Sequence, residues 1–202
     1  MSRTDSSFTT RSGHVLTGTV VQPVGPVRAV ALFAHCFTCT RASLAAVRIT
    51  DELARLGIAT LRVDFAGLGS SEGDFASVGF PGDVDDLIDA AEHLAATIGA
   101  PQLLIGHSLG GAAVLAAAAR IPSTRVVATI GAPSDVSHVL DSIDGDLQAI
   151  EAQGRGEVSI AGRRFPLSAA FVRSAREADV LAAVKQLHHP ILIAHAPGDT
   201  VV

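Results

Sequence analysis

Short apolar segments alternate with longer amphipathic segments along most of the chain. The short segments are rich in β-branched residues and are bounded by glycine or proline, which predicts strands, whereas the longer ones repeat apolar residues at helical spacing. Strands are expected at residues 14–21, 28–35, 58–65, 101–106, 126–131 and 191–195, and helices at 44–56, 83–98 and 109–120, with a glycine- and serine-rich loop at 67–79. This alternation predicts an α/β fold, with a mostly parallel sheet and helices on both faces.

About sixty residues between the last two expected strands, from Ala132 to Pro190, interrupt the alternation. Residues 158–165 within this segment have the pattern of a hairpin, with Ala161 and Gly162 at its turn. Long insertions beside a sheet often act as lids. We therefore expect a small cap at about residues 133–189 within a single domain that spans residues 1–202.

Composition and charge narrow the classes of protein that the chain can represent. The 202 residues are 48% hydrophobic, which is enough to bury one sizeable core. Lys and Arg number 15 against 20 Asp and Glu, for a formal net charge of -5, and the basic residues form no cluster. Nucleic acid is therefore not an expected partner.

No segment has the length and hydrophobicity of a membrane span. The first residues are polar and lack the apolar centre of a signal peptide. The longest apolar runs, residues 29–34 and 112–119, are far shorter than the ~20 residues that a bilayer requires. These features predict a cytoplasmic protein without membrane partners.

The chain contains two cysteines, Cys36 and Cys39, three positions apart. A bridge between them would close too small a loop to hold a fold together, so they are not expected to form a structural disulfide framework. The C-x-x-C spacing also matches redox motifs, and thiol chemistry at these two residues remains an alternative function.

The strongest chemical signal is the pentapeptide Gly106-His107-Ser108-Leu109-Gly110, which matches G-x-S-x-G between an expected strand and an expected helix. A sharp strand-to-helix turn exposes a serine hydroxyl to substrate, and such a turn needs small residues at Gly106 and Gly110, with Gly111 giving further room. The alternative is a glycine-rich turn with a capping serine. The strand before the motif and the helix after it favour Ser108 as a nucleophile.

With this motif the chain resembles the α/β-hydrolase superfamily over essentially its whole length. More narrowly, the segments at residues 33–39, 64–69 and 131–135 look like the hydrolase half of bacterial proteins fused to a domain of the osmotically inducible protein C (OsmC) family. The resemblance implies an α/β-hydrolase fold and a fused OsmC-type domain as a partner. No cofactor or metal is expected.

The resemblance also implies two backbone donors that stabilise the oxyanion of an acyl intermediate. One is the N–H of Leu109, and the other lies in the loop after the strand that ends at His35. Related proteins usually carry His-Gly there, whereas this chain has His35-Cys36, so the second donor is either Cys36 or Phe37, with Phe37 preferred. His35, Cys36 and His107 are expected near the substrate. The alternative for this loop is a plain strand end with two buried thiols.

Asp199 follows the last expected strand, at the place where the resemblance puts the carboxylate of a catalytic triad. Its role would be to orient a histidine. The alternative is an aspartate that stabilises the turn after Pro197 and Gly198.

The chain order serine, acid, histidine predicts that the catalytic base follows Asp199, yet the sequence ends at Val202. All eight histidines are expected to be more structural or superficial than catalytic, including His138, His188 and His189 in the insertion and His195 at the end of a buried strand. Loss of the base alone costs about 10⁶ in turnover in a triad enzyme. We therefore expect a poorly soluble, nearly inactive fragment that lacks a last strand and helix.

Together these features predict a serine hydrolase that cleaves a carboxylic ester or a related acyl bond through an acyl-enzyme on Ser108. Two alternatives are a non-catalytic domain that partners an OsmC-type redox module and the thiol chemistry at Cys36 and Cys39. A metal site at His188, His189, His195 and Asp199 lacks a recognised spacing.

Overall fold

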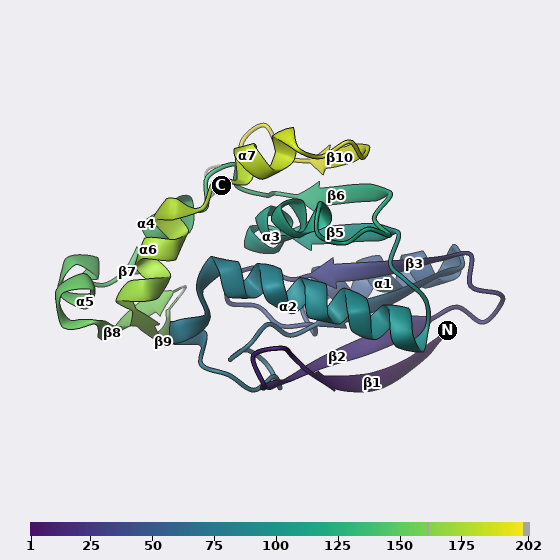
Figure 1. The fold of residues 1–202 in the computed structure, drawn as a ribbon, viewed down its shortest axis with the longest axis horizontal. Helices are drawn as coiled ribbons and strands as arrows, with labels where there is room; N and C mark the ends of the chain where they lie inside the picture. The colour runs from purple at the N-terminus through teal and green to yellow at the C-terminus, as the bar shows by residue number, and fades with distance from the viewer. Residues whose placement is uncertain (161, 200–202) are drawn as a thin grey trace.

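The computed structural model describes residues 1–160 and 162–199. Within these residues seven strands form one sheet in the order β1-β2-β4-β3-β5-β6-β10 (Figure 1). They are β1 (Ser2–Thr9), β2 (Val15–Gln22), β3 (Ala29–Ala34), β4 (Ile58–Val63), β5 (Leu103–His107), β6 (Val126–Ile130) and β10 (Ile191–Ala194). Five adjacent strands, β4, β3, β5, β6 and β10, pair in parallel. Strands β1 and β2 are antiparallel to their neighbours. The predicted mostly parallel sheet is confirmed.

Helices cover both faces of this sheet. The helix α1 (Leu44–Arg55) lies behind it in Figure 1, and α2 (Phe75–Thr97) and α3 (Leu109–Ala118) lie in front. Alternate side chains of β3 enter two separate cores, because successive residues of a strand point to opposite faces. Phe33 packs with residues of α1, whereas Leu32 belongs to the cluster that contains the apolar faces of α2 and α3.

The register aligns the carboxyl ends of the parallel strands at one edge of the sheet. Ala34 of β3 pairs with Gly106 of β5, and Ile130 of β6 pairs with both His107 of β5 and Ala194 of β10. In open α/β sheets ligands bind beyond this edge. The loops that leave β3, β5, β6 and β10 therefore meet where a site is expected.

Two elements differ from the sequence prediction. Strand β1 was not expected, because its residues are mostly polar and exposed and give no apolar alternation; its pairing with β2 from end to end holds it in place. Helix α2 begins at Phe75, inside the expected loop at 67–79. It is kinked at Gly79, whose φ of 61° is non-helical, and it contains Pro81.

The insertion after β6, which we call the cap, consists of short elements. These are α4 (His138–Asp141), β7 (Ile143–Asp144), α5 (Leu147–Gln153), β8 (Arg155–Ile160), β9 (Arg163–Ser168), α6 (Ala169–Glu177) and α7 (Val180–Lys185). The predicted hairpin is confirmed as β8 and β9, with Val158 opposite Phe165; Ala161 of its turn lies outside the described residues. Figure 1 shows α4, α5, α6 and the hairpin to one side of the sheet, while α7 returns toward β10.

Aromatic rings join the cap to the rest of the molecule. The Phe37 ring lies 5.5 Å from that of Phe75 and 5.4 Å from that of Phe171, between ring centroids, and Phe165 lies 5.4 Å from Phe75. Offset or tilted aromatic pairs at such distances add to the stability that burial provides. The cap is therefore packed on the domain through the loop that follows β3.

The last strand is more exposed than predicted. Leu192 and Ile193 of β10 are 64% and 69% exposed, and His195 after them is also exposed, so the expectation that His195 ends a buried strand is wrong. The reason is that β10 pairs with β6 on one side only within the described residues.

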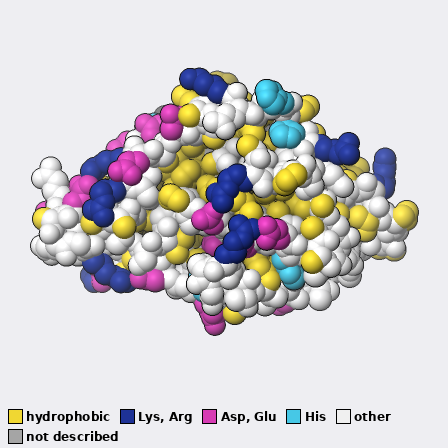
Figure 2. Space-filling view, viewed as in Figure 1, with side chains coloured by type: hydrophobic (Ala, Val, Ile, Leu, Met, Phe, Trp, Pro, Cys, Tyr) yellow, Lys and Arg dark blue, Asp and Glu magenta, His cyan; other side chains and the backbone are white. Residues whose placement is uncertain are grey.

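Charged side chains of both signs are interspersed on the face seen in Figure 2. Ion pairs such as Arg120 with Asp85 and Arg164 with Glu157 join exposed residues of opposite charge. In the part of the chain that the structure describes, the helices are too short or too polar to span a membrane.

Candidate active site

Ser108 occupies a sharp turn between β5 and α3. Its φ of 53° and ψ of -128° make it the one non-glycine residue with positive φ among the described residues. The Ser108 N–H donates to the Ile130 carbonyl at 2.9 Å, which fixes the turn to the end of β6. Positive φ at a non-glycine residue is strained and recurs at functional sites. The Ser108 side chain makes no capping hydrogen bond to α3, so the alternative of a capping serine is wrong.

The glycines around Ser108 are needed because other backbone atoms approach them closely. A Cβ atom on Gly106 would lie 2.2 Å from the Gly110 oxygen, and one on Gly110 would lie 2.3 Å from the His35 oxygen. A Cβ atom on Gly111 would lie 2.5 Å from the Ala132 Cβ. These contacts explain why the motif carries small residues, and they set the turn directly against the end of β3.

Three of the predicted residues line one small cavity of about 60 Å³. Ser108, Leu109 and Phe37 form its inner side. The outer side comes from the cap and the segment leading into it, through Pro133, His138, Val139 and Ser142. The structure thus brings the expected nucleophile and the two preferred oxyanion residues to one cavity, which residues at the start of the insertion also line.

His35 holds the loop after β3 and does not line this cavity. Its side chain is buried, its Nδ1 donates to the Cys36 carbonyl at 2.8 Å, and its Nε2 accepts from the Phe65 N–H at 3.3 Å. Burial lowers the pKa of His35, which keeps the ring neutral, as these two hydrogen bonds require. The ring therefore orients the carbonyl of Cys36 and so the loop that carries Phe37.

Cys36 and Cys39 form a disulfide in the same loop, with their Cα atoms 5.3 Å apart. The Cys39 N–H donates to the Cys36 carbonyl at 3.1 Å, so the bridge spans one hydrogen-bonded turn. The alternative of two buried thiols is therefore wrong. A bridge this short cannot restrain the whole chain, yet it can restrain the turn in which it lies.

Asp64 is a supporting residue that the sequence prediction missed. Its carboxylate is fully buried and accepts from the Arg41 N–H at 2.6 Å and the Ser70 N–H at 3.0 Å, and it pairs with the Arg41 guanidinium. These bonds tie the loop after β3 to the loop after β4. The signal that could have found Asp64 is its place just past the carboxyl end of β4, at the ligand-binding edge of the sheet.

Asp199 lies at this same edge, beyond β6 and β10. The Gly131 N–H donates to the Ala194 carbonyl at 2.9 Å, and the Asp199 Oδ2 lies 3.8 Å from the position of a Cβ atom on Gly131. The Asp199 Oδ2 is also 3.6 Å from the Nε2 of His195. Asp199 is therefore next to the end of β6. The carbonyl of Ile130, the last residue of β6, accepts the hydrogen bond from the Ser108 N–H.

His107 precedes Ser108 and is half-buried. Burial lowers its pKa. His107 is absent from the lining of the cavity that contains Ser108. Within the described residues no three His, Cys, Asp or Glu side chains gather as a metal site.

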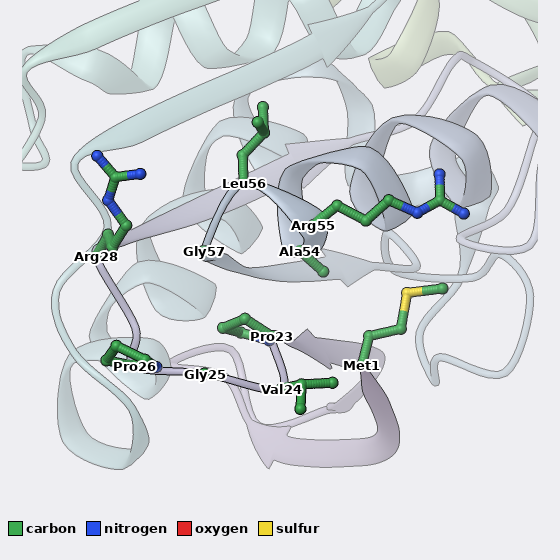
Figure 3. A pocket seen from close by; sticks show the side chains of 10 residues that line it. All are labelled: Met1, Pro23, Val24, Gly25, Pro26, Arg28, Ala54, Arg55, Leu56 and Gly57. Atoms are coloured by element: carbon green, nitrogen blue, oxygen red, sulfur yellow. The ribbon is translucent and has the colours of Figure 1, made fainter.

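A larger cavity of about 480 Å³ lies at the opposite edge of the sheet (Figure 3). Its walls are the turn between β2 and β3, including Val24 and Pro26, and the end of α1 with Arg55 and Leu56. This is the amino end of β3 and β4, away from Ser108. This cavity is the larger of the two. The small cavity is nevertheless the candidate active site, because it contains Ser108 with its strained backbone.

Comparisons with known proteins agree with this geometry. Residues 31–200 match the model of the alpha/beta hydrolase family. The esterase domain of a Rhodothermus marinus protein is 37% identical, with a TM-score of 0.78 over 100% of this chain and 79% of that one. The structure of Est1E from Butyrivibrio proteoclasticus with bound ferulic acid has a TM-score of 0.82 at 22% identity, over 98% of this chain and 80% of that one, which is a likeness of fold.

A curated relative extends the comparison to thioesters. The mitochondrial palmitoyl-protein thioesterase ABHD10 of Rattus norvegicus is 28% identical over 165 residues, which are 78% of this chain and 54% of the rat protein. The chain thus spans about half the length of the curated relatives that it matches.

Proposed function

Because the chain belongs to the alpha/beta hydrolase family, we propose that it is a serine hydrolase that cleaves a carboxylic ester or a related acyl bond through an acyl-enzyme on Ser108. One observation carries this proposal. Ser108 has a strained backbone conformation and lines one cavity with Leu109 and Phe37. Strain of this kind persists only where the surrounding structure imposes it, and here it presents a hydroxyl to a cavity.

The reaction begins with attack of the Ser108 Oγ on the acyl carbon. Negative charge then develops on the carbonyl oxygen, and the backbone N–H groups of Leu109 and Phe37 stabilise it. The alcohol or thiol leaves, and a water molecule attacks the acyl-enzyme to release the acid. Supporting this assignment, the loop that carries Phe37 is held by His35, by the disulfide and by Arg41 on Asp64.

Asp199 takes the role of the orienting acid in this proposal. Its position beside Gly131 puts it one strand away from Ser108 at the carboxyl edge of the sheet. The carboxylate of a triad orients a histidine and stabilises the imidazolium without itself becoming protonated. The histidine that receives the Ser108 proton follows the acid in the chain order of such enzymes.

Relatives named for ester and thioester hydrolysis support the proposed bond class. One solved structure is an esterase domain and one curated relative is a palmitoyl-protein thioesterase. Both reactions transfer an acyl group through the same kind of tetrahedral intermediate, so the same nucleophile and oxyanion donors serve either bond.

The test is the Ser108→Ala variant of the full-length protein. It should lose fluorophosphonate labelling and lower the turnover of p-nitrophenyl esters by about 10⁵- to 10⁶-fold, because the nucleophile is removed. The matched control is Ser7→Ala, an exposed serine of β1, which should label and turn over as wild type does. A folded wild-type protein that fails to label would overturn the proposal and favour a non-catalytic partner domain.

The disulfide favours a second candidate, thiol–disulfide exchange at Cys36 and Cys39. The double variant Cys36→Ser with Cys39→Ser separates the two functions. The serine mechanism predicts that this variant still labels at Ser108. Exchange chemistry predicts that it loses all reaction with a small dithiol, which reduces the Cys36–Cys39 bridge and is itself oxidised to a disulfide, while Ser108→Ala retains that reaction.

A further inference from the structure

The start of the cap forms one whole side of the cavity above Ser108. Four of the seven lining residues come from the segment that leaves β6, from α4 and from the residue that caps its end, namely Pro133, His138, Val139 and Ser142. The sequence prediction treated His138 as a structural or surface residue of the insertion. Its side chain is 57% exposed, and it also lines the small cavity that contains Ser108.

Asp141 orients the His138 ring. The Nδ1 of His138 lies 3.1 Å from the Asp141 Oδ2. An ionised carboxylate can only accept hydrogen bonds, so Nδ1 carries the proton that is shared with Asp141. In the neutral imidazole the Nε2 atom is then a hydrogen-bond acceptor.

Ser142 adds a second acceptor to this wall. Its Oγ donates to the Val139 carbonyl at 2.7 Å, so its only proton is already used. The lone pairs of this oxygen remain to accept from another group. The other lining side chains of the cap, Pro133 and Val139, are apolar.

The volume limits what can bind beside Ser108. A cavity of about 60 Å³ equals the space of only a few water molecules, at roughly 10 to 15 Å³ for each. A group of a few heavy atoms fills it. An acyl group attached at Ser108 lies in the cavity that His138 and Ser142 also line.

From these contacts we infer that the cavity is an acyl site selective for short acyl groups that carry a hydroxyl, with His138 as the residue that recognises the hydroxyl and Ser142 beside it. This inference rests on the proposed function. A hydroxyl can donate to the Nε2 acceptor, whereas an aliphatic group of the same size cannot. The His138 side chain is 57% exposed, so the expected gain is that of one solvent-accessible hydrogen bond.

The experiment compares p-nitrophenyl 3-hydroxypropanoate with p-nitrophenyl butanoate. The two esters share a leaving group and the same number of heavy atoms, and differ by a terminal hydroxyl in place of a methyl. In the full-length protein His138→Leu should lower the ratio of their kcat/KM values, hydroxy ester over butanoate, by about 3- to 10-fold, the loss of one neutral hydrogen bond.

Two further variants sharpen the result. His138→Gln, which keeps an acceptor, should recover part of the ratio, and Ser142→Ala should lower it by a smaller factor. The control His188→Leu removes an exposed histidine of the insertion that does not line the cavity, and it should leave the ratio unchanged. If His138→Leu does not fold, the ratios of the Gln and Ser142 variants decide the matter.

Three outcomes would overturn the inference while leaving the serine hydrolase intact, provided that Ser108 still labels with a fluorophosphonate. One is an unchanged ratio in His138→Leu. Another is an equal loss for both esters, which indicates a structural role for His138. The third is a wild-type preference for p-nitrophenyl decanoate over butanoate, because a ten-carbon chain exceeds this cavity. Absence of labelling would instead overturn the proposed function itself.

Discussion

The two sides of the cavity above Ser108 are built by different means. The inner side is fixed by backbone, because Gly106 and Gly110 lie where any Cβ atom would meet main-chain atoms of neighbouring segments. The outer side belongs to α4, a four-residue helix whose His138 is 57% exposed at the side chain. Side chains on the outer side can be substituted without moving the backbone of the inner side. Under the proposed function, the inner side sets the chemistry and the outer side sets the choice of acyl group.

The attachment of the cap follows the same division. It depends on side-chain contacts, among them the rings of Phe171 and Phe37 and the exposed ion pair of Arg155 with Asp74. The Ser174 hydroxyl also accepts from the Phe80 N–H at 3.3 Å, next to the kink of α2. Such contacts contribute in small increments, whereas the turn at Ser108 depends on a few absolute steric limits.

The largest effect is expected from Gly110→Ala, which attacks the backbone side. The added Cβ atom would lie 2.3 Å from the His35 oxygen and 2.6 Å from the Ala34 oxygen, and no rotamer change can relieve a clash with main-chain atoms. We expect a loss of more than about 4 kcal/mol in the free energy of unfolding. Urea denaturation followed by circular dichroism measures it, together with the rate of fluorophosphonate labelling.

Gly25→Ala is the matched control for that variant. Gly25 has no atom within 4 Å of a Cβ position, and its φ is not in the left-handed range. Its substitution should change stability by less than about 0.5 kcal/mol. Equal stability of the two variants would show that the turn at Ser108 is not limited by backbone contact.

The next largest effect is expected from Phe171→Ala, which attacks the side-chain side. Phe171 is 3% exposed and its ring contacts Phe37 and Phe75. Truncating a buried phenylalanine typically costs about 3 to 4 kcal/mol. Limited proteolysis should cut the cap of this variant first, while Phe171→Leu, which keeps most of the volume, should lose about 1 kcal/mol and resist cleavage. Cleavage that starts in the central sheet would contradict this separation of the two regions.

The contrast also explains how much could be predicted from sequence. The turn at Ser108 is a local motif between two strongly patterned elements, so its residues and their glycine requirement were predictable. The role of His138 was not, because a four-residue helix has no periodicity and its nearness to Ser108 arises from tertiary packing. Strand β1 was not predicted for a similar reason, because its polar residues are held by pairing with β2 and not by burial.

The loop after β3 shows a second limit. Its position beside the nucleophile followed from the resemblance, and Phe37 does line the cavity. The contacts that hold this loop in place were not predictable from the sequence. The hydrogen bonds of Asp64 to Arg41 and the bridge between Cys36 and Cys39 depend on how the chain packs in space. Burial of His35, which makes it a support for the loop and not a wall of the cavity, likewise depends on packing.

The smallest effect is expected from a charged group that is buried in the domain. The charged groups of the cap, in contrast, are mostly exposed. Asp86 of α2 is 3% exposed; its Oδ2 accepts from the Ala66 N–H at 2.9 Å, and its Oδ1 lies 3.5 Å from the Nε2 of His14. Burial raises the pKa of Asp86 to about 6, against an ordinary 3.8, and the nearby charge of Asp89 adds to the rise. The folded protein therefore binds more protons than the unfolded chain between about pH 4 and pH 6, and its stability falls as the pH rises through that window.

Asp86→Asn should remove this dependence, because its amide oxygen can still accept from the Ala66 N–H while the side chain no longer ionises. Near pH 7.5 the variant should be more stable than wild type by about 3 kcal/mol, the scale of a shift of this size, and near pH 4 the two should converge. Urea denaturation at the two pH values measures the difference. The control is Asp85→Asn, which removes an exposed carboxylate on the same helix that pairs with Arg120, and which should keep the wild-type slope. Parallel curves for wild type and Asp86→Asn would show that the domain tolerates this buried charge as readily as the cap tolerates its exposed ones.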